Sequence, residues 1–129
     1  MNIGQAAKDT GLSVRMIRHY EKIGLIPEAL RRDSNYRDYD RSDLSRLKFI
    51  RRARDLGFSV KDIGTLLGQQ KEEGRDDRRV REIGDGHLLR LKGQLRELQE
   101  MIALLESIAE RCRHSGRCGC IILDVLSED

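Results

Sequence analysis

Three cysteines near the end of this 129-residue chain carry the side chains best suited to metal chemistry. They are Cys112, Cys118 and Cys120, with His114 between the first two. Thiolates prefer soft cations, and two thiolates in near-linear geometry suit Cu(I), Ag(I) or Au(I). A larger set that adds Cys118 and His114 resembles a tetrahedral site for Zn(II). The segment therefore predicts a soft-metal site, which could use either two thiolates or the larger set of ligands.

Arginines and tyrosines form a second group of candidate functional residues, in the N-terminal half. Residues 1–60 carry 13 Lys and Arg against 8 Asp and Glu, a net charge of +5, whereas residues 61–129 carry 12 against 14, a net charge of −2. A basic half attached to a near-neutral one fits a domain that binds a polyanion. Arginine can pair with O6 and N7 of guanine, and tyrosine and arginine can contact phosphates. The candidates are Arg15 and Arg18 for bases, and Tyr20, Arg31, Tyr36, Arg37 and Arg54 for phosphates.

Two short helices joined by a tight turn position the two base-reading candidates. Residues 2–8 predict the first helix, and Gly11 can end the turn that follows it. Ser13 is placed to cap a second helix, from Val14 to about Ile23. This pattern predicts a helix-turn-helix, whose second helix enters the major groove of DNA.

An alternating segment and two further helices complete a predicted DNA-binding domain over residues 1–70. Residues 30–40 suit a small β-wing, with Asn35 in its turn. Two capping patterns then predict helices, one running to about Leu56 and one beyond it. They are Asp40 with Asp43, and Ser59 with Asp62.

A heptad repeat follows a charged segment, residues 71–79, which predicts a hinge or linker. Apolar and small residues then recur at alternating spacings of four and three: Gly84, Leu88, Leu91, Leu95, Leu98, Ile102, Leu105, Ala109 and Cys112. Such a stripe predicts a coiled coil, and its most direct partner is a second copy in a homodimer. We expect a dimerisation helix over residues 80–111, then a metal-binding loop and short terminal helix over residues 112–129.

Several motifs of the chain resemble those of the MerR family of transcriptional regulators. They are Ile17-Arg18-His19-Tyr20-Glu21, Gly24-Leu25-Ile26, Asn35-Tyr36-Arg37 and Gly57-Phe58-Ser59. The similarity extends over the whole chain and is closest to the copper-efflux regulators. Those place two cysteines, separated by seven residues, after the dimerisation helix. At the matching positions stand Cys112 and Cys120, which makes Cys118 a spectator.

The resemblance implies a mainly α fold, with a winged helix-turn-helix head, an antiparallel coiled coil and a C-terminal metal loop. It implies a homodimer on double-stranded promoter DNA with an unusually long spacer. Metal binding would make the dimer bend and untwist that DNA for RNA polymerase. By matching positions, Arg15 and Arg18 would read bases, and the five phosphate candidates above would clamp the backbone.

One departure from the family pattern leaves the metal open between two classes. Copper sensors carry Ser at the position of Asp77, whereas sensors of divalent metals carry Cys there. The resemblance therefore implies Cu(I), Ag(I) or Au(I) as the sensed ion, with Zn(II), Cd(II) or Pb(II) as the alternative.

Other functional classes find little support in the sequence. No run of roughly 18 apolar residues predicts a membrane span, and no secretory signal is visible, so we expect a cytoplasmic protein with reduced thiols. No phosphate-binding glycine loop or catalytic triad is present, so we expect no enzyme. A coiled-coil scaffold that does not bind DNA would explain residues 80–112, but not the predicted helix-turn-helix and wing.

Overall fold

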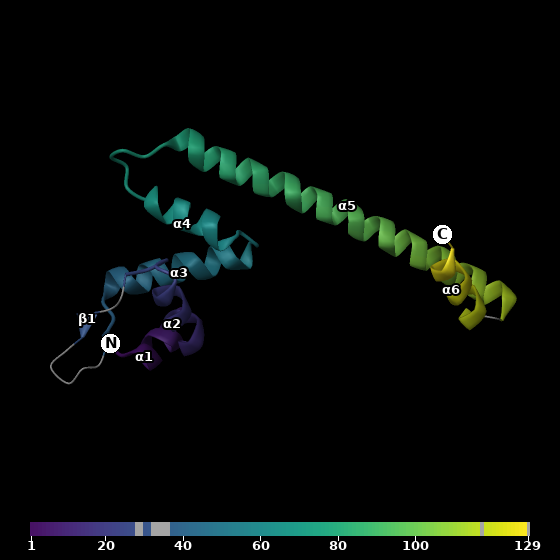
Figure 1. Ribbon diagram of the computed structural model, residues 1–129, viewed down its shortest axis with the longest axis horizontal. Helices are drawn as coiled ribbons and strands as arrows, with labels where there is room; N and C mark the ends of the chain where they lie inside the picture. The colour runs from purple at the N-terminus through teal and green to yellow at the C-terminus, as the bar shows by residue number, and fades with distance from the viewer. Residues whose placement is uncertain (28–29, 32–36, 117, 129) are drawn as a thin grey trace. The chain divides into compact units, whose positions relative to one another are not determined.

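A computed structural model of the chain describes residues 1–27, 30–31, 37–116 and 118–128. For five of these only the backbone is described: Leu30, Arg31, Arg37, Cys118 and Cys120. Within this part of the chain, six helices and one pair of short strands follow one another (Figure 1). The chain divides into two compact units, which we call the head (Met1–Ile83) and the arm (Gly84–Asp129). The mainly α prediction is confirmed.

The first two helices of the head form the predicted helix-turn-helix. They are α1 (Ile3–Thr10), capped by the side chain of Asn2, and α2 (Val14–Lys22), capped by that of Ser13. Gly11 between them has a φ of 76°, in the left-handed region that favours glycine. Helix α1 is longer at its C-terminal end than the sequence suggested.

The predicted wing is a two-stranded antiparallel ribbon. Strand β1 (Leu30–Arg31) pairs with β2 (Arg37–Asp38), so that Arg31 lies opposite Arg37. Asn35, which we expected in its turn, lies outside the described residues.

Helices α3 (Arg41–Asp55) and α4 (Val60–Gly68) follow the wing and begin where their caps predict. The Asp43 N–H donates to Asp40 Oδ1 at 2.8 Å, and the Asp40 N–H donates to Asp43 Oδ2 at 3.0 Å. Burial raises the pKa of the Asp43 carboxyl above its usual value. Ser59 caps α4 by accepting from the backbone of its third residue, at 3.1 Å. Both predicted caps are therefore confirmed.

A side chain of α3 holds the turn of the helix-turn-helix in place. Arg51 Nη1 donates to the Thr10 carbonyl at 3.1 Å, and its guanidinium covers Gly11. A Cβ added to Gly11 would lie 1.6 Å from that nitrogen. The absence of a side chain at position 11 therefore allows both the backbone conformation and the close approach of Arg51.

The core of the head forms where the four helices meet the end of the wing. Apolar residues three apart on one helix, such as Ile17 and Tyr20 on α2, share a face that is turned inward. The buried core consists of Ala6, Ile17, Tyr20, Ile26, Tyr39, Leu47, Ile50, Ala53 and Ile63. This packing leaves the opposite face of α2 to polar side chains.

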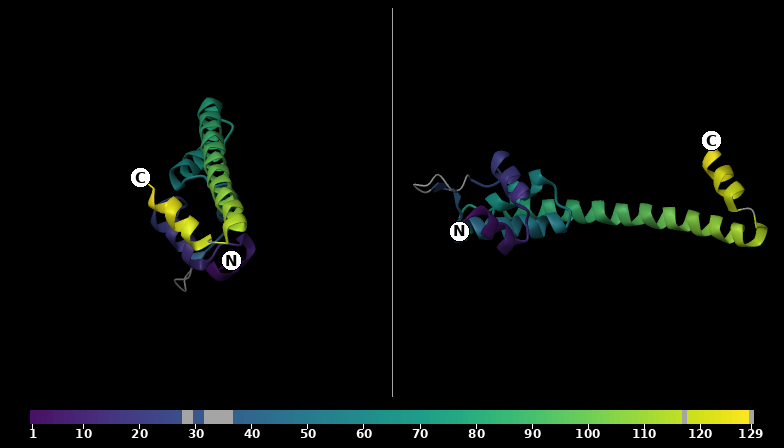
Figure 2. Two further views of the ribbon diagram at one scale, coloured as in Figure 1. Left: turned by 90° about the vertical axis from the view of Figure 1, so that its right-hand side faces the viewer. Right: turned by 90° about the horizontal axis from the view of Figure 1, so that it is seen from below.

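The arm consists of all of α6 and most of α5, as Figures 1 and 2 show. Helix α5 (Asp77–Ser115) is one continuous helix of 39 residues that begins in the head. The turn between α4 and α5 covers residues 69–76, close to the predicted linker. No described helix combines the length and the apolar character needed to cross a membrane.

The turn between α5 and α6 (Cys118–Ser127) is shorter than the predicted metal loop. We expected residues between Cys112 and Cys120 to form a loop, because Gly116 and Gly119 interrupt the sequence. Gly116 alone takes a left-handed conformation, with a φ of 67°, whereas Gly119 lies in α6. The cysteines therefore lie at the adjoining ends of two helices.

Candidate DNA interface and metal site

The outward face of α2 carries the two predicted base-reading side chains. Arg15 and Arg18 are both exposed, and residues three apart on a helix share one side of it. Ile17 and Tyr20 are buried in the core. Helix α2 therefore presents two guanidinium groups, whose fixed fork of donors matches the acceptors of a guanine edge.

Tyr20 is a core residue of the head, and its contact with phosphate stays a prediction. Its side chain is 1% exposed. It follows Ile17 by three residues and therefore shares the inward face of α2. Its ring lies 5.9 Å from that of His19, which is exposed beside it.

The wing and the end of α3 hold the remaining predicted phosphate contacts. Arg31 and Arg37 lie opposite each other in the ribbon, where the structure describes their backbones. Tyr36 lies outside the described residues. Arg54 is exposed in the last turn of α3. These four contacts stay predictions.

A buried polar pair that we did not predict joins α2 to the end of the wing. Glu21 is 5% exposed and Tyr39 is 3% exposed, and the Tyr39 hydroxyl donates to Glu21 Oε1. The sequence contained one signal of this pair. Glu21 follows Ile17 by four residues, so an acidic side chain lies on the apolar face of α2, and a buried carboxylate requires a hydrogen-bonding partner.

The last turns of α5 hold the first predicted metal ligand. Cys112 is half-buried and is disulfide-bonded, so its sulfur lies within bonding distance of a second cysteine sulfur. The side chains of Cys118 and Cys120 lie outside the described part of the structure. We expected reduced thiols. The fold brings the two sulfurs close enough to bond. Whether they are bonded or reduced depends on the redox state of the compartment. After reduction, two such thiolates suit one soft ion.

His114 is held on the outer surface of α5. Its Nε2 lies 2.9 Å from Glu110 Oε1, and Arg113 Nη2 lies 3.2 Å from the other oxygen of that carboxylate. Among the described side chains, no three of the types His, Cys, Asp and Glu gather as a metal-binding group. The larger ligand set, which needs the side chains of Cys118 and Cys120, therefore stays a prediction.

Asp77 is the first residue of α5 and is exposed. Its Oδ1 lies 3.0 Å from Nε of Arg75. A carboxylate is favourable at this end of a helix, because the first backbone N–H groups carry partial positive charge. In the single chain, the Asp77 carboxylate therefore stabilises the N-terminus of α5.

Comparison with known proteins agrees with this arrangement of elements. The sequence profile of MerR HTH family regulatory proteins matches residues 1–70, and a second profile, described as MerR, DNA binding, matches residues 44–108. The chain belongs to the MerR family. "Heavy metal-dependent transcription regulator 2" of Rhizobium meliloti (strain 1021) is 42% identical to it over 127 residues, which cover 98% of this chain and 86% of that protein.

Two further MerR-family proteins resemble the chain over nearly its full length. The HTH-type transcriptional regulator CueR of Salmonella typhimurium is 34% identical over 98% of this chain and 92% of its own. The transcription regulator PbrR691 from Ralstonia metallidurans CH34, whose crystal structure is a complex with lead(II), matches with a TM-score of 0.79. Their sequences are 32% identical, over 98% of this chain and 99% of that one.

Membership of the MerR family decides between the functional classes considered above. These relatives are transcription regulators, so this MerR-family protein is a regulator and not an enzyme. The alternative of a coiled-coil scaffold that does not bind DNA is wrong, since the family profile of HTH regulatory proteins matches residues 1–70, which that alternative leaves unexplained.

Proposed function

We propose that this MerR-family protein is a metal-responsive transcriptional activator that binds promoter DNA as a homodimer. The observation that carries the proposal is the position of Cys112. It lies at the end of the apolar stripe of α5, with a second cysteine sulfur within bonding distance. A soft-metal site there would be built into the dimerisation element itself. A DNA-bound regulator of this kind acts in the cytoplasm.

The head binds the operator through two kinds of contact. Arg15 and Arg18 read base edges from α2, while Arg54 and the wing residues Arg31, Tyr36 and Arg37 contact phosphates. The exposure of the guanidinium groups on α2 and on α3 supports this division. In the metal-bound state the dimer bends and untwists a promoter with a long spacer, so that RNA polymerase can use it.

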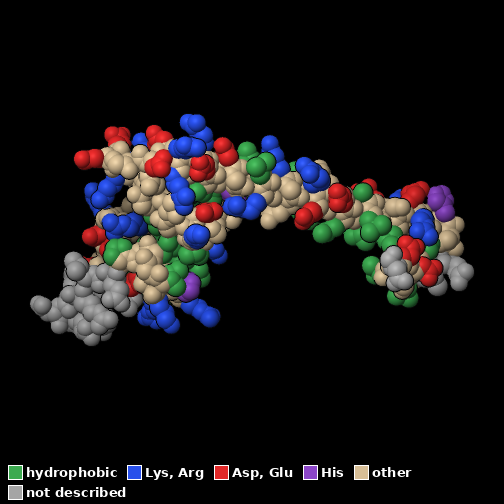
Figure 3. Space-filling model, turned by 45° about the horizontal axis from the view of Figure 1, so that its top comes forward, with side chains coloured by type: hydrophobic (Ala, Val, Ile, Leu, Met, Phe, Trp, Pro, Cys, Tyr) green, Lys and Arg blue, Asp and Glu red, His purple; other side chains and the backbone are tan. Residues whose placement is uncertain are grey.

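The arm forms the dimer as an antiparallel coiled coil. Six large apolar side chains of its stripe are between 40% and 62% exposed in the single chain: Leu88, Leu91, Leu95, Leu98, Ile102 and Leu105. Figure 3 shows apolar side chains on the surface of α5, gathered toward its C-terminal end. A continuous apolar stripe of this kind is stable in water when a second helix covers it.

The sensed ion is Cu(I), or the chemically similar Ag(I) or Au(I), held by Cys112 and Cys120. Two thiolates satisfy a soft monovalent ion, whereas Zn(II) usually takes four ligands. The engagement of His114 by Glu110 supports the small ligand set. The similarity to CueR supports the same assignment.

A divalent ion, such as Zn(II), Cd(II) or Pb(II), is the second candidate. Two observations favour it: the similarity to PbrR691, whose structure is a complex with lead(II), and the carboxylate of Asp77. Asp77 of one subunit would then add an oxygen ligand to the thiolates of the other.

Titration of the reduced dimer under anaerobic conditions, with Cu(I) and separately with Zn(II), tests the choice of ion. We expect tight binding of one Cu(I) per subunit, abolished in Cys112→Ser and in Cys120→Ser. The matched control, Cys118→Ser, removes a thiol from the same segment and should bind Cu(I) as the wild type does. Tight Zn(II) binding that Asp77→Ser weakens would overturn the Cu(I) assignment and support the divalent sensor.

A further inference from the structure

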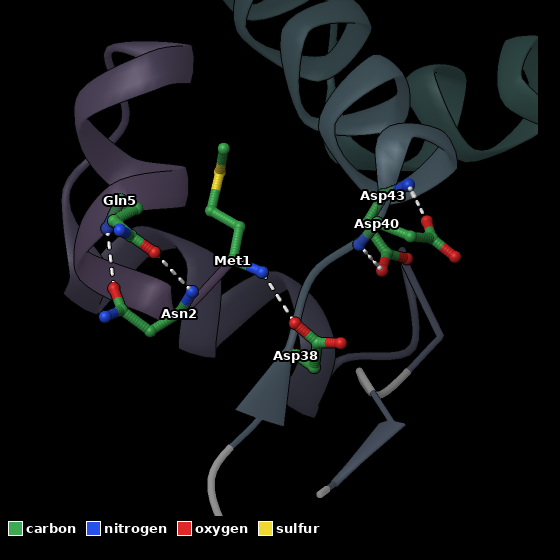
Figure 4. Close-up of polar contacts among 6 residues, drawn as sticks. All are labelled: Met1, Asn2, Gln5, Asp38, Asp40 and Asp43. Atoms are coloured by element: carbon green, nitrogen blue, oxygen red, sulfur yellow. Dashed lines mark hydrogen bonds and ion pairs between the residues drawn. The ribbon is translucent and has the colours of Figure 1, made fainter.

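Three consecutive residues, beginning with the last residue of the wing, bind three different parts of the head. The Asp38 carboxylate lies 2.6 Å from the Met1 ammonium nitrogen, and Asp40 caps α3 (Figure 4). Between them, the Tyr39 N–H donates to the Met1 carbonyl at 2.7 Å, and the Tyr39 hydroxyl donates to Glu21. The end of β2 is thus connected at once to the start of α1, to α2 and to α3.

The connection to α2 is the one made inside the core. Both Tyr39 and Glu21 are nearly inaccessible to solvent. A carboxylate in such a place is costly unless hydrogen bonds satisfy it, and a phenol donor also needs an acceptor. The pair therefore has a strong preference for one relative placement of its two backbones.

The two ends of this hydrogen bond lie on the two elements that would touch DNA. Glu21 belongs to the same helix as Arg15 and Arg18, on its inward face. Tyr39 directly follows β2, the strand that holds Arg37. A change in the distance between the recognition helix and the wing would have to break or strain the bond.

We propose that the Tyr39–Glu21 hydrogen bond is a positioning link that sets the wing relative to the recognition helix. Tyr39 is thereby a positioning residue for binding of duplex DNA, although its side chain is buried and touches no DNA. Because of the link, α2 can read bases and the wing can contact phosphates on the same DNA duplex at the same time. This inference rests on the proposed DNA binding.

Tyr39→Phe is the test variant, because it removes only the hydroxyl and changes no charge. Ile63→Val is the matched control. Ile63 is fully buried in α4, so its shortening weakens the same core without touching the link. The probe is a duplex that the wild-type protein selects from a random pool. Binding is measured over a salt series, well below the thermal midpoint of each protein.

We expect Tyr39→Phe to bind the probe about tenfold more weakly, with a salt dependence whose slope falls by about one to two, as expected for the loss of one phosphate contact per subunit. Hydroxyl-radical footprinting should lose protection at the flanking backbone, while interference by guanine N7 methylation persists. Ile63→Val should keep the wild-type slope and footprint, because a smaller folded fraction lowers the apparent affinity equally at every salt concentration.

Two results would overturn the link: a wild-type slope and footprint for Tyr39→Phe, or the same loss of flanking protection in Ile63→Val. Failure of the proposed function is a separate result. A wild-type protein that selects no duplex would remove DNA binding, and the positioning role with it.

Discussion

Leu98→Glu is expected to convert the proposed homodimer into monomers. Leu98 lies in the middle of the apolar stripe of α5 and is 55% exposed in the single chain, and in the proposed dimer a second helix covers it. Loss of the leucine and burial of a carboxylate together cost about 3 kcal/mol at one site. The dimer contains the change twice, so its dissociation constant should rise by about ten-thousandfold. Sedimentation equilibrium at micromolar concentration measures this directly.

Leu89→Glu is the control for that experiment. Leu89 is 71% exposed on the same helix but lies outside the 4-3 stripe, and the substitution is identical. The control should sediment as the wild-type dimer does. If Leu98→Glu also remained dimeric, the stripe would not be the dimer interface.

Arg18→Ala should lower the affinity for the selected operator by about thirtyfold or more. A good bidentate contact to a base provides about 1–3 kcal/mol of discrimination, and the dimer loses two of them. Binding to unrelated duplex DNA should fall much less, because phosphates dominate that binding. The ratio of specific to non-specific affinity, measured by competition at one salt concentration, is therefore the sensitive quantity.

Arg96→Ala is the control for Arg18→Ala, because it also removes one positive charge per subunit. Arg96 is exposed on α5 and belongs to the arm, whereas the recognition helix belongs to the head. We expect it to leave the specificity ratio unchanged. An equal loss in Arg96→Ala and Arg18→Ala would mean that overall charge, and not base reading by α2, determines the affinity.

Local signals predicted most of the head correctly. Asp40 and Ser59 cap their helices because each side-chain oxygen satisfies a backbone N–H within three residues, a pattern confined to a short window. Gly11 ends α1 for an equally local reason, its positive φ. Such features depend on neighbours in the sequence and can be seen without the fold.

The features that the sequence did not show arose where distant segments decide the environment of a side chain. Tyr20 has the chemistry of a phosphate contact, but the core formed by other helices encloses it. Tyr39, which donates to Glu21, is 18 residues away, beyond the wing, and no local pattern connects them. The two glycines near the cysteines both suggested a loop, and only the backbone of Gly116 takes the loop conformation.

The measurement that tests the central claim most directly is transcription in vitro from a promoter that the protein binds, with purified RNA polymerase. Reactions without metal, with Cu(I) and with Zn(II) are compared for the reduced wild type and for Cys112→Ser, after equal promoter occupancy has been shown for both. We predict that Cu(I) raises the transcript level with the wild type and leaves it unchanged with Cys112→Ser. A transcript level that does not depend on metal, or an equal response of Cys112→Ser, would contradict the account.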